Sequence, residues 1–259
     1  MGLFIPEEPE QFTGLRKTGF PRYKEVLERS WKEFFFVGFL TLLYFIPFAG
    51  GMVYAILSKS ALAAVAAGLV GGSIAGPGYA CLVDLILRRL RNDRDDWWAS
   101  YKKAMGQNWR AAILPGIVQC LFMGMIAFGA ALMIWGAGTV TMGTLLLLLF
   151  ASLLLTVLMM AWWPQVALFE QKQTIRVKNA LFFSIFHFKK VFLASLVQVL
   201  WWAVIALFMP WTAFAVPILG VWYVLYVGLF LIYPDMDRDF RIEEQIEEKF
   251  PGVMEEEEE

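Results

Sequence analysis

The sequence predicts an all-α, polytopic membrane protein with six transmembrane helices and amphipathic cytoplasmic surface helices. The first observation behind this prediction is composition: 59% of the 259 residues are hydrophobic, more than the polar surface of a water-soluble globule could cover. The second is charge, since the 17% of residues that are charged gather in a few segments with long uncharged runs between them. The third is length: a hydrocarbon core of about 30 Å needs roughly 20 apolar residues as helix, and such runs recur along the chain.

Six segments meet this length requirement. Only residues 210–212 separate the last two. The predicted spans are Phe34 to Leu57, Ala61 to Leu87, Ala112 to Trp135, Met142 to Leu168, Val191 to Met209 and Ala213 to Ile232.

The basic residues predict the orientation. Of the 22 Lys and Arg, 21 lie before the first span, in the second-to-third and fourth-to-fifth connections, or in the tail, and Lys59 is the remaining one. Basic residues near a span are retained on the cytoplasmic side, so we expect both termini in the cytoplasm. The predicted organisation is a cytoplasmic segment with a surface helix (1–33), a six-helix domain (34–232) with cytoplasmic segments 88–111 and 169–190, and an acidic cytoplasmic tail (233–259).

The second span contains small residues at a regular spacing. Gly68, Gly72 and Gly76 repeat every four positions, which places them on one helical face and allows another backbone to approach closely. Pro77 follows and is expected to kink or hinge the helix. This pattern is typical of a tight helix crossing within the chain, and it also suits a gated pathway or a docking face for another subunit.

Asp84 is an acidic residue inside a predicted span, where burial of a charge is costly. Arg88 lies four residues later on the same face, so the two could form a structural pair or belong to a coupling or transport site. Five further residues with polar groups lie in apolar surroundings: Gln119, Gln165, Gln198, Trp201 and Trp202. They either pack and form hydrogen bonds between helices, or they line a polar path.

The second-to-third connection is predicted to hold an amphipathic helix. Trp98, Tyr101, Met105 and Trp109 recur at spacings of three and four, and Asn108 lies beside them. Such a stripe anchors a helix at the inner membrane surface or docks a cytoplasmic protein. We expect another surface helix over 21–33, and we expect the acidic residues from Glu243 onward to remain solvated without stable structure.

The sequence lacks the residue patterns that are typical of a catalytic or metal site. The net charge of −1 argues against nucleic acid as a partner, and two Cys in apolar stretches give no disulfide or metal pattern. His187 is the sole His and has no ligand-type residue at metal-binding spacing, while Ser73 has no nearby base. We therefore predict no catalytic residue, no metal ligand and no bound cofactor.

One region resembles a known family. The stretch Gly76-Pro77-Gly78-Tyr79-Ala80, then Arg88-Arg89, Trp97-Trp98 and Gly106-Gln107-Asn108-Trp109-Arg110, is similar to the signature region of the YesL-like family of bacterial membrane proteins, a domain of unknown function. The resemblance extends from about Trp31 to Pro234. Members commonly occur with carbohydrate importers of the ATP-binding-cassette (ABC) type, which implies an accessory role beside the permease subunits.

Two functions are thus expected. The first is a non-enzymatic accessory subunit or assembly factor of an ABC-type carbohydrate importer in the bacterial cytoplasmic membrane, with the lipid bilayer and the permease subunits as partners. The alternative is a stand-alone small-solute transporter or channel, in which Asp84 and the intramembrane Gln residues line a polar path.

Overall fold

The protein is described by a computed structural model, which covers residues 2–3, 19–93, 95–135 and 141–249. It is an all-α, multi-pass membrane protein. In the described part of the chain, six helical segments are long and apolar enough to cross a membrane. Those segments are Gly19–Leu57, Ala61–Leu90, Trp97–Ile134, Met142–Leu168, Phe188–Leu207 and Val216–Phe240.

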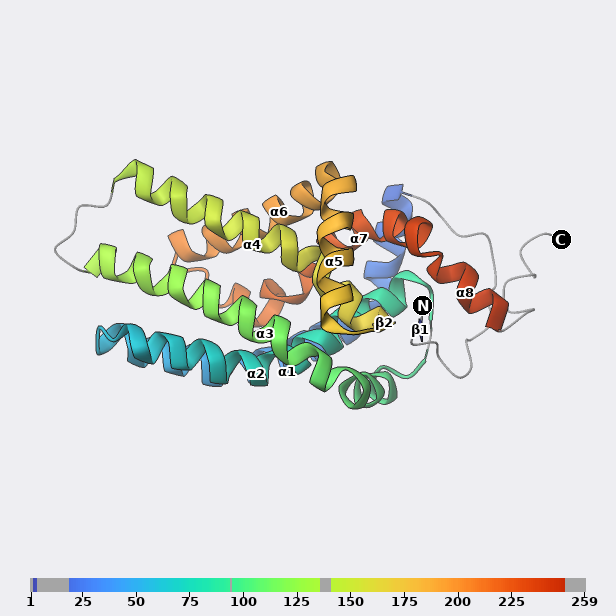
Figure 1. The fold of residues 1–259 in the computed structure, drawn as a ribbon, viewed down its shortest axis with the longest axis horizontal. Helices are drawn as coiled ribbons and strands as arrows, with labels where there is room; N and C mark the ends of the chain where they lie inside the picture. The colour runs from blue at the N-terminus through green and yellow to red at the C-terminus, as the bar shows by residue number, and fades with distance from the viewer. Residues whose placement is uncertain (1, 4–18, 94, 136–140, 250–259) are drawn as a thin grey trace.

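Most of these helices run along one axis, and a single helix crosses them (Figure 1). The long elements are α1 (Gly19–Leu57), α2 (Ala61–Leu90), α3 (Trp97–Trp135), α4 (Met142–Leu168), α6 (Phe188–Leu207) and α7 (Trp222–Phe240), with a π-helical turn (Val216–Gly220) before α7. The crossing helix is α5 (Gln173–Phe186), and α8 (Ile242–Lys249) follows α7. Two-residue strands β1 (Gly2–Leu3) and β2 (Phe169–Glu170) pair antiparallel, with Leu3 opposite Phe169.

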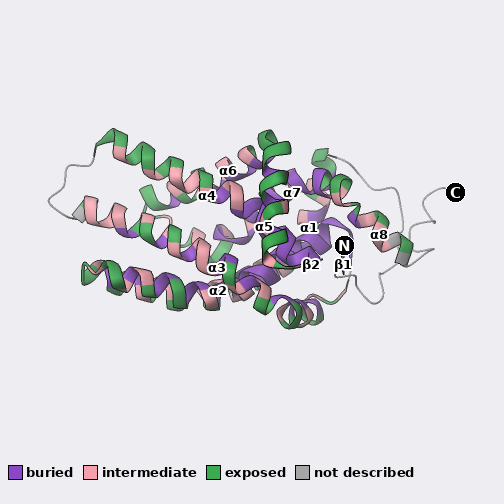
Figure 2. Cartoon of the chain, in the orientation of Figure 1, coloured by how far each residue is buried: buried purple, intermediate pink, exposed green. Residues whose placement is uncertain are grey.

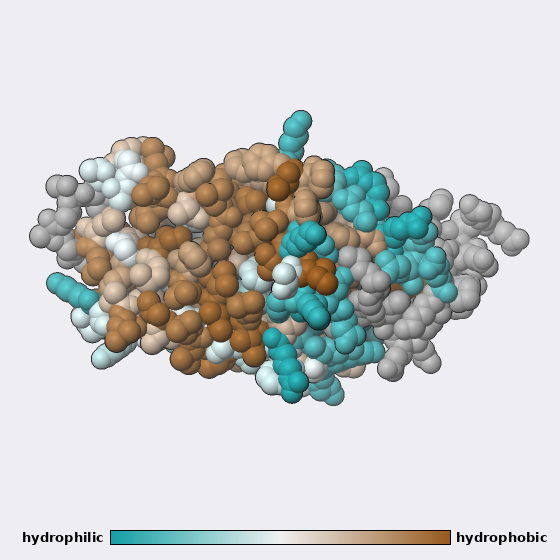
Figure 3. All heavy atoms as spheres, in the orientation of Figure 1, coloured by the Kyte–Doolittle hydropathy of each residue, from teal (hydrophilic) through white to brown (hydrophobic). Residues whose placement is uncertain are grey.

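Hydrophilic side chains gather at the end of the molecule that holds α8, and hydrophobic ones cover the middle (Figure 3). α1 has 39 residues, or roughly 58 Å of helix at about 1.5 Å per residue. Because the hydrocarbon core is about 30 Å thick, α1 extends well beyond it. The extension carries the charged residues 22–33, so it belongs to the hydrophilic end.

Packing is densest at this hydrophilic end. Every residue from 78 to 93 is buried, so the second half of α2 is enclosed on all sides, mainly by α1 and α3 with α4 and α7. Toward the opposite end, Figure 2 shows progressively more exposed residues on the helices. The hydrocarbon-facing half of the bundle is therefore more open than the half near the charges.

The expected helices over 21–33 and in the second-to-third connection are present, but each is continuous with a long helix, and the tail is partly structured. Residues 21–33 do not form a separate surface helix, because α1 continues unbroken from Gly19 to Leu57. The amphipathic segment of the second-to-third connection is likewise the first part of α3, although its first turns lie across the bundle axis (Figure 1). The acidic tail is helical over Ile242–Lys249, since Ile242 is fully buried and Tyr233 Oη donates to Glu243 Oε1 at 2.8 Å. Residues 250–259 of the tail lie outside the described residues.

Candidate functional site

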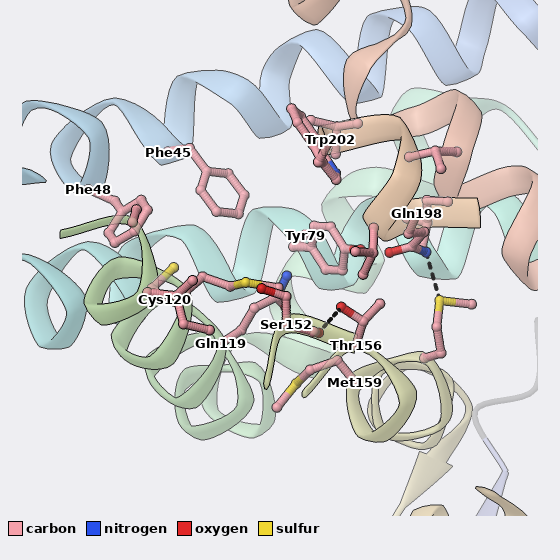
Figure 4. Close-up of a pocket in the computed structure, with 18 of the residues that line it drawn as sticks. Phe45, Phe48, Tyr79, Gln119, Cys120, Ser152, Thr156, Met159, Gln198 and Trp202 are labelled. Atoms are coloured by element: carbon pink, nitrogen blue, oxygen red, sulfur yellow. Dashed lines mark hydrogen bonds between the residues drawn. The ribbon is translucent and has the colours of Figure 1, made fainter. Parts of the chain in front are cut away.

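A cavity lies inside the bundle, between α1, α2, α3, α4, α6 and α7 (Figure 4). It encloses about 630 Å³, within the range of about 300–1,000 Å³ that is usual for ligand pockets. Most of its lining is aromatic, aliphatic or methionine. The labelled lining residues in Figure 4 are Phe45, Phe48, Tyr79, Gln119, Cys120, Ser152, Thr156, Met159, Gln198 and Trp202.

The polar groups of the lining are bonded largely to the protein itself. Ser152 Oγ donates to the Leu148 carbonyl at 2.8 Å, and Thr156 Oγ1 donates to the Ser152 carbonyl at 2.7 Å. Trp163 Nε1 donates to Gln119 Oε1 at 2.6 Å. The Gln198 amide nitrogen lies 2.7 Å from Met160 Sδ, a weak acceptor. The lining is therefore mostly apolar, and several of its polar groups have partners within the protein.

The structure brings together only part of the predicted polar set at this cavity. Gln119, Gln198 and Trp202 line it, whereas Gln165 and Trp201 do not. Gln165 is fully buried on α4, and no described group lies within hydrogen-bonding distance of its amide. Trp201 packs against Tyr223, with ring centroids 6.1 Å apart, and its indole nitrogen also lacks a partner among the described groups.

Asp84 and Arg88 lie away from the cavity lining, in a buried ion pair at the hydrophilic end. Arg88 Nε donates to Asp84 Oδ2 at 2.7 Å, and Arg88 Nη1 donates to Asp93 Oδ2 at 3.0 Å. The Asp84 and Arg88 residues are 3% and 2% exposed. Two carboxylates therefore compensate the charge of this buried guanidinium, and Asp84 is one of them.

Neighbouring groups extend this pair into a polar layer that joins α1 to α2. Arg89 Nε donates to Glu33 Oε2 at 2.6 Å, and Asn92 Oδ1 accepts from both Arg22 and Arg29. Asn92 has a positive φ of 67°, in the left-handed region that Asn tolerates better than most residues, and the chain leaves α2 there.

Asp95 belongs to the same layer. Burial raises the pKa of this carboxyl above its ordinary value, and the neighbouring Asp93 carboxylate adds to the rise, while nearby Arg88 and Arg89 oppose it.

The glycines of α2 face α3 at very short range. A Cβ added to Gly68 would lie 2.7 Å from Leu121 Cα, and one added to Gly72 would lie 2.5 Å from the Gly116 carbonyl oxygen. At Gly76 the added atom would meet the Ala112 carbonyl oxygen. The three glycines therefore form a crossing within the chain, and α3 occupies the face on which a partner would dock. Pro77 is accommodated inside the continuous helix α2.

The aromatic stripe of α3 divides into two parts. Tyr101 is buried and Met105 partly buried against the core, whereas Trp98 and Trp109 are 44% and 45% exposed. Each exposed ring has a cation above it: Lys102 Nζ is 5.9 Å from the Trp98 centroid, and the Arg110 guanidinium is 5.0 Å from the Trp109 centroid. Asn108 is 1% exposed, so it does not belong to the exposed part of the stripe.

A second exposed apolar surface lies on α5. On the outer face of α5, Leu181, Phe182, Ile185 and Phe186 are between 47% and 77% exposed. The opposite face of α5 packs onto the bundle through buried residues such as Ala180 and Phe183. The spacing of these residues by one, three and four indicates an apolar face on a helix. It does not indicate the direction in which that helix crosses the bundle.

The structure also gives His187 partners that the sequence did not indicate. His187 Nε2 lies 2.6 Å from Asp239 Oδ2, and Nδ1 lies 3.5 Å from Asp235 Oδ2. Lys190 Nζ adds a contact of 2.8 Å to Asp235. These contacts join the start of α6 to the end of α7. The acidic partners are about fifty residues distant in sequence, so local spacing could not reveal them.

Among the described residues, no group of three His, Cys, Asp or Glu side chains could hold a metal ion, and Cys81 and Cys120 are buried free thiols. No protein-family model, curated protein or solved structure matches this chain.

Proposed function

We propose that this chain is a non-enzymatic accessory subunit or assembly factor of an ABC-type carbohydrate importer in the bacterial cytoplasmic membrane, with both termini in the cytoplasm. The single observation that supports a docking role is the exposed apolar face of α5, defined by Leu181, Phe182, Ile185 and Phe186. The resemblance to the YesL-like family supplies the importer and its substrate class. The predicted orientation rests on the basic residues.

The position of the α5 face supports a docking role. Lys172, Lys178, Lys189 and Lys190 lie in or beside α5, which places the helix near the charged end of the bundle. Lipid headgroups, rather than hydrocarbon, surround a membrane protein at such a level. An apolar face of this extent is typical of a contact with another protein, and the permease helices of an importer provide a membrane-embedded apolar surface.

The surface continues from α5 onto α3. The Gln173 side-chain amide donates to the Ala111 carbonyl, so the start of α5 lies beside the segment that carries Trp109. Exposed aromatic residues with Arg neighbours are common anchors at interfaces, because they bury a large area at little entropic cost. Trp98 and Trp109 therefore join the α5 face as the proposed docking surface.

Copurification tests this proposal. The tagged protein, extracted in a mild detergent, is expected to bring down permease subunits. Replacing Phe182 and Phe186 with Ala should lower the recovered permease by about tenfold or more, since two aromatic anchors are lost. The matched control is Phe122→Ala with Phe150→Ala, because these rings are 56% and 58% exposed on α3 and α4, away from the docking surface. A lone monomer in the eluate, with sugar uptake unchanged after deletion, contradicts the proposal.

A second candidate function is a stand-alone solute transporter. The observation that favours it is the cavity, which reaches Gln119 and Gln198 within the bundle. Asp84, which a polar path was expected to include, is instead held by Arg88, so the transport proposal now depends on the two Gln residues. If the protein transports solute without partner subunits, the unaltered protein should show flux in proteoliposomes and Gln198→Leu should abolish it. The accessory role predicts no flux with the unaltered protein or with the Gln198 variant.

A further inference from the structure

We propose that the cavity between α1, α2, α3, α4, α6 and α7 binds one hydrocarbon chain of a membrane phospholipid, which enters laterally from the bilayer. This inference goes beyond the accessory role and does not depend on it. It concerns an intramembrane site that lies apart from the α5 docking surface.

The dimensions of the cavity suit an extended chain. Its lining runs along α4 from Leu149 to Trp163, roughly 21 Å of helix axis at about 1.5 Å per residue. On α1 it runs from Leu42 to Met52, roughly 15 Å by the same rise. The cavity therefore extends along the bundle axis over at least half of the hydrocarbon core of about 30 Å, which is the depth that one lipid leaflet provides.

The chemistry of the lining selects hydrocarbon over sugar. The Ser152 and Thr156 hydroxyls donate to carbonyls of their own helix, and the Gln119 carbonyl oxygen accepts from Trp163. A sugar would bury many hydroxyls, and the lining offers few groups that are free to bond them, so binding a sugar would leave buried polar groups unpaired. A methylene chain makes no such demand, and flexible Met side chains such as Met123 and Met159 adapt to its shape.

Exposed lining residues show where the chain enters. Trp202 and Leu149 line the cavity and are 39% and 44% exposed, so they mark where it is accessible. Ala49 and Ala206, whose side chains are small, line it and are exposed as well. All four belong to the hydrocarbon-facing half of the molecule, where the helices are less densely packed. A lipid chain therefore reaches the cavity without moving its headgroup through an apolar region.

An empty cavity would be unfavourable in this setting. Its walls would lose the dispersion contacts that a packed interior provides, while hydrocarbon is available at the opening. Water would find few unbonded polar groups in it. A lipid chain restores these contacts at little desolvation cost.

Crosslinking in membranes of known composition tests the proposal on the unaltered protein. The chain is reconstituted into vesicles of phosphatidylethanolamine and phosphatidylglycerol that include a phospholipid with a photoreactive diazirine on its acyl chain. We expect labelled peptides at Met52 and Met160, which line the cavity and are 6% and 3% exposed. Labelling confined to lipid-facing residues such as Leu147 would overturn the proposal, and so would a fall in Met52 labelling when excess maltose is added.

A filled cavity provides the complementary test. Ala203 lines the cavity on α6, and Ala203→Phe should lower the phospholipid retained in native mass spectrometry by about tenfold, because the added ring occupies space that the acyl chain would fill. The control is Ala66→Phe, since Ala66 is exposed on α2 and does not line the cavity. Equal retention in the two variants would contradict the proposal. If Ala203→Phe fails to fold, the crosslinking result on the unaltered chain decides the question.

Discussion

The Arg88 guanidinium shows how single residues determine the hydrophilic end of this protein. It is 2% exposed and contacts Asp84 at 2.7 Å and Asp93 at 3.0 Å. Removing one member of such a buried set leaves a charge without compensation, which is far more costly than losing a pair on the surface.

Asp84→Asn is therefore expected to destabilise the protein by about 3–5 kcal/mol, measured as the loss of folded protein on thermal or denaturant unfolding in detergent. Glu28→Gln is the matched control, because Lys24 and Glu28 form a pair at the same helical spacing with side chains 65% and 66% exposed. The control should lose no more than about 1 kcal/mol. Equal losses in the two variants would show that the buried pair has no special role.

The raised pKa of the Asp95 carboxyl predicts that the stability of the protein depends on pH. Burial, with the Asp93 carboxylate, raises the pKa of the folded carboxyl above its unfolded value. The contribution of this group to stability is therefore fully present below the unfolded pKa of about 3.9 and is lost as pH rises through the folded pKa. Asp95→Asn should be more stable than the unaltered protein at neutral pH, and the difference should disappear near pH 4. Melting curves of both proteins across this range test the sign, and a destabilised Asn variant at neutral pH would refute it.

At the scale of elements, α2 is the helix against which α1 and α3 pack most closely. Its glycines bring the α3 backbone against it, and Gly71 brings α1 equally close, with an added Cβ lying 2.5 Å from Phe48 Cα. Close approach of backbones is the main source of helix association in lipid, where there is no hydrophobic driving force between helices.

Gly72→Ala should consequently weaken the protein although Ala is the better helix former. The added methyl group would meet a backbone oxygen that cannot move aside, which we expect to cost about 1–3 kcal/mol. Gly106→Ala on α3 is the control, since nothing lies within 4 Å of its added Cβ, and it should be neutral or stabilising by up to about 1 kcal/mol. Thermal stability in one detergent compares the two, and a stable Gly72 variant would argue against the crossing.

The sequence predicts that the long helices exist, but it does not predict which helical segments are continuous with one another. Long apolar runs are visible in the sequence, and six of them match helices in the structure. The charged residues 22–33 suggested a separate surface helix, but a helix that leaves the membrane shows the same change from apolar to polar residues without a break. The crossing direction of α5 depends on contacts with α4 and α6, which the local pattern does not specify.

The whole molecule is dense near its charged end and more open toward the other end (Figure 2). The buried Asp84–Arg88 pair lies in the dense part, and the cavity extends into the more open part. Asp84 and Arg88 could be paired from their spacing of four residues, whereas the cavity is lined by residues from six helices and no local pattern records it. The candidate site was thus predicted only as separate polar residues, of which Gln119, Gln198 and Trp202 share one place.

Orientation in the membrane gives a prediction for the whole chain. Ser58 lies in the turn between α1 and α2, at the end opposite the charged layer, and Lys189 lies near the start of α6. A membrane-impermeant maleimide applied to intact cells should label Ser58→Cys and leave Lys189→Cys unlabelled until the cells are opened. The native Cys81 and Cys120 are buried and should give little background. Labelling of Lys189→Cys from outside would reverse the proposed orientation.

The enclosure of α2 also has a consequence for biosynthesis. The last turns of this helix carry Arg88 and Arg89, and they have no lipid-facing side in the finished protein. While the chain emerges from the ribosome, those turns are costly to expose to lipid until α1 and α3 are beside them. The first three helices are therefore expected to leave the translocon together, already packed against one another. A chain truncated after α2 should accordingly be recognised as unfinished and degraded.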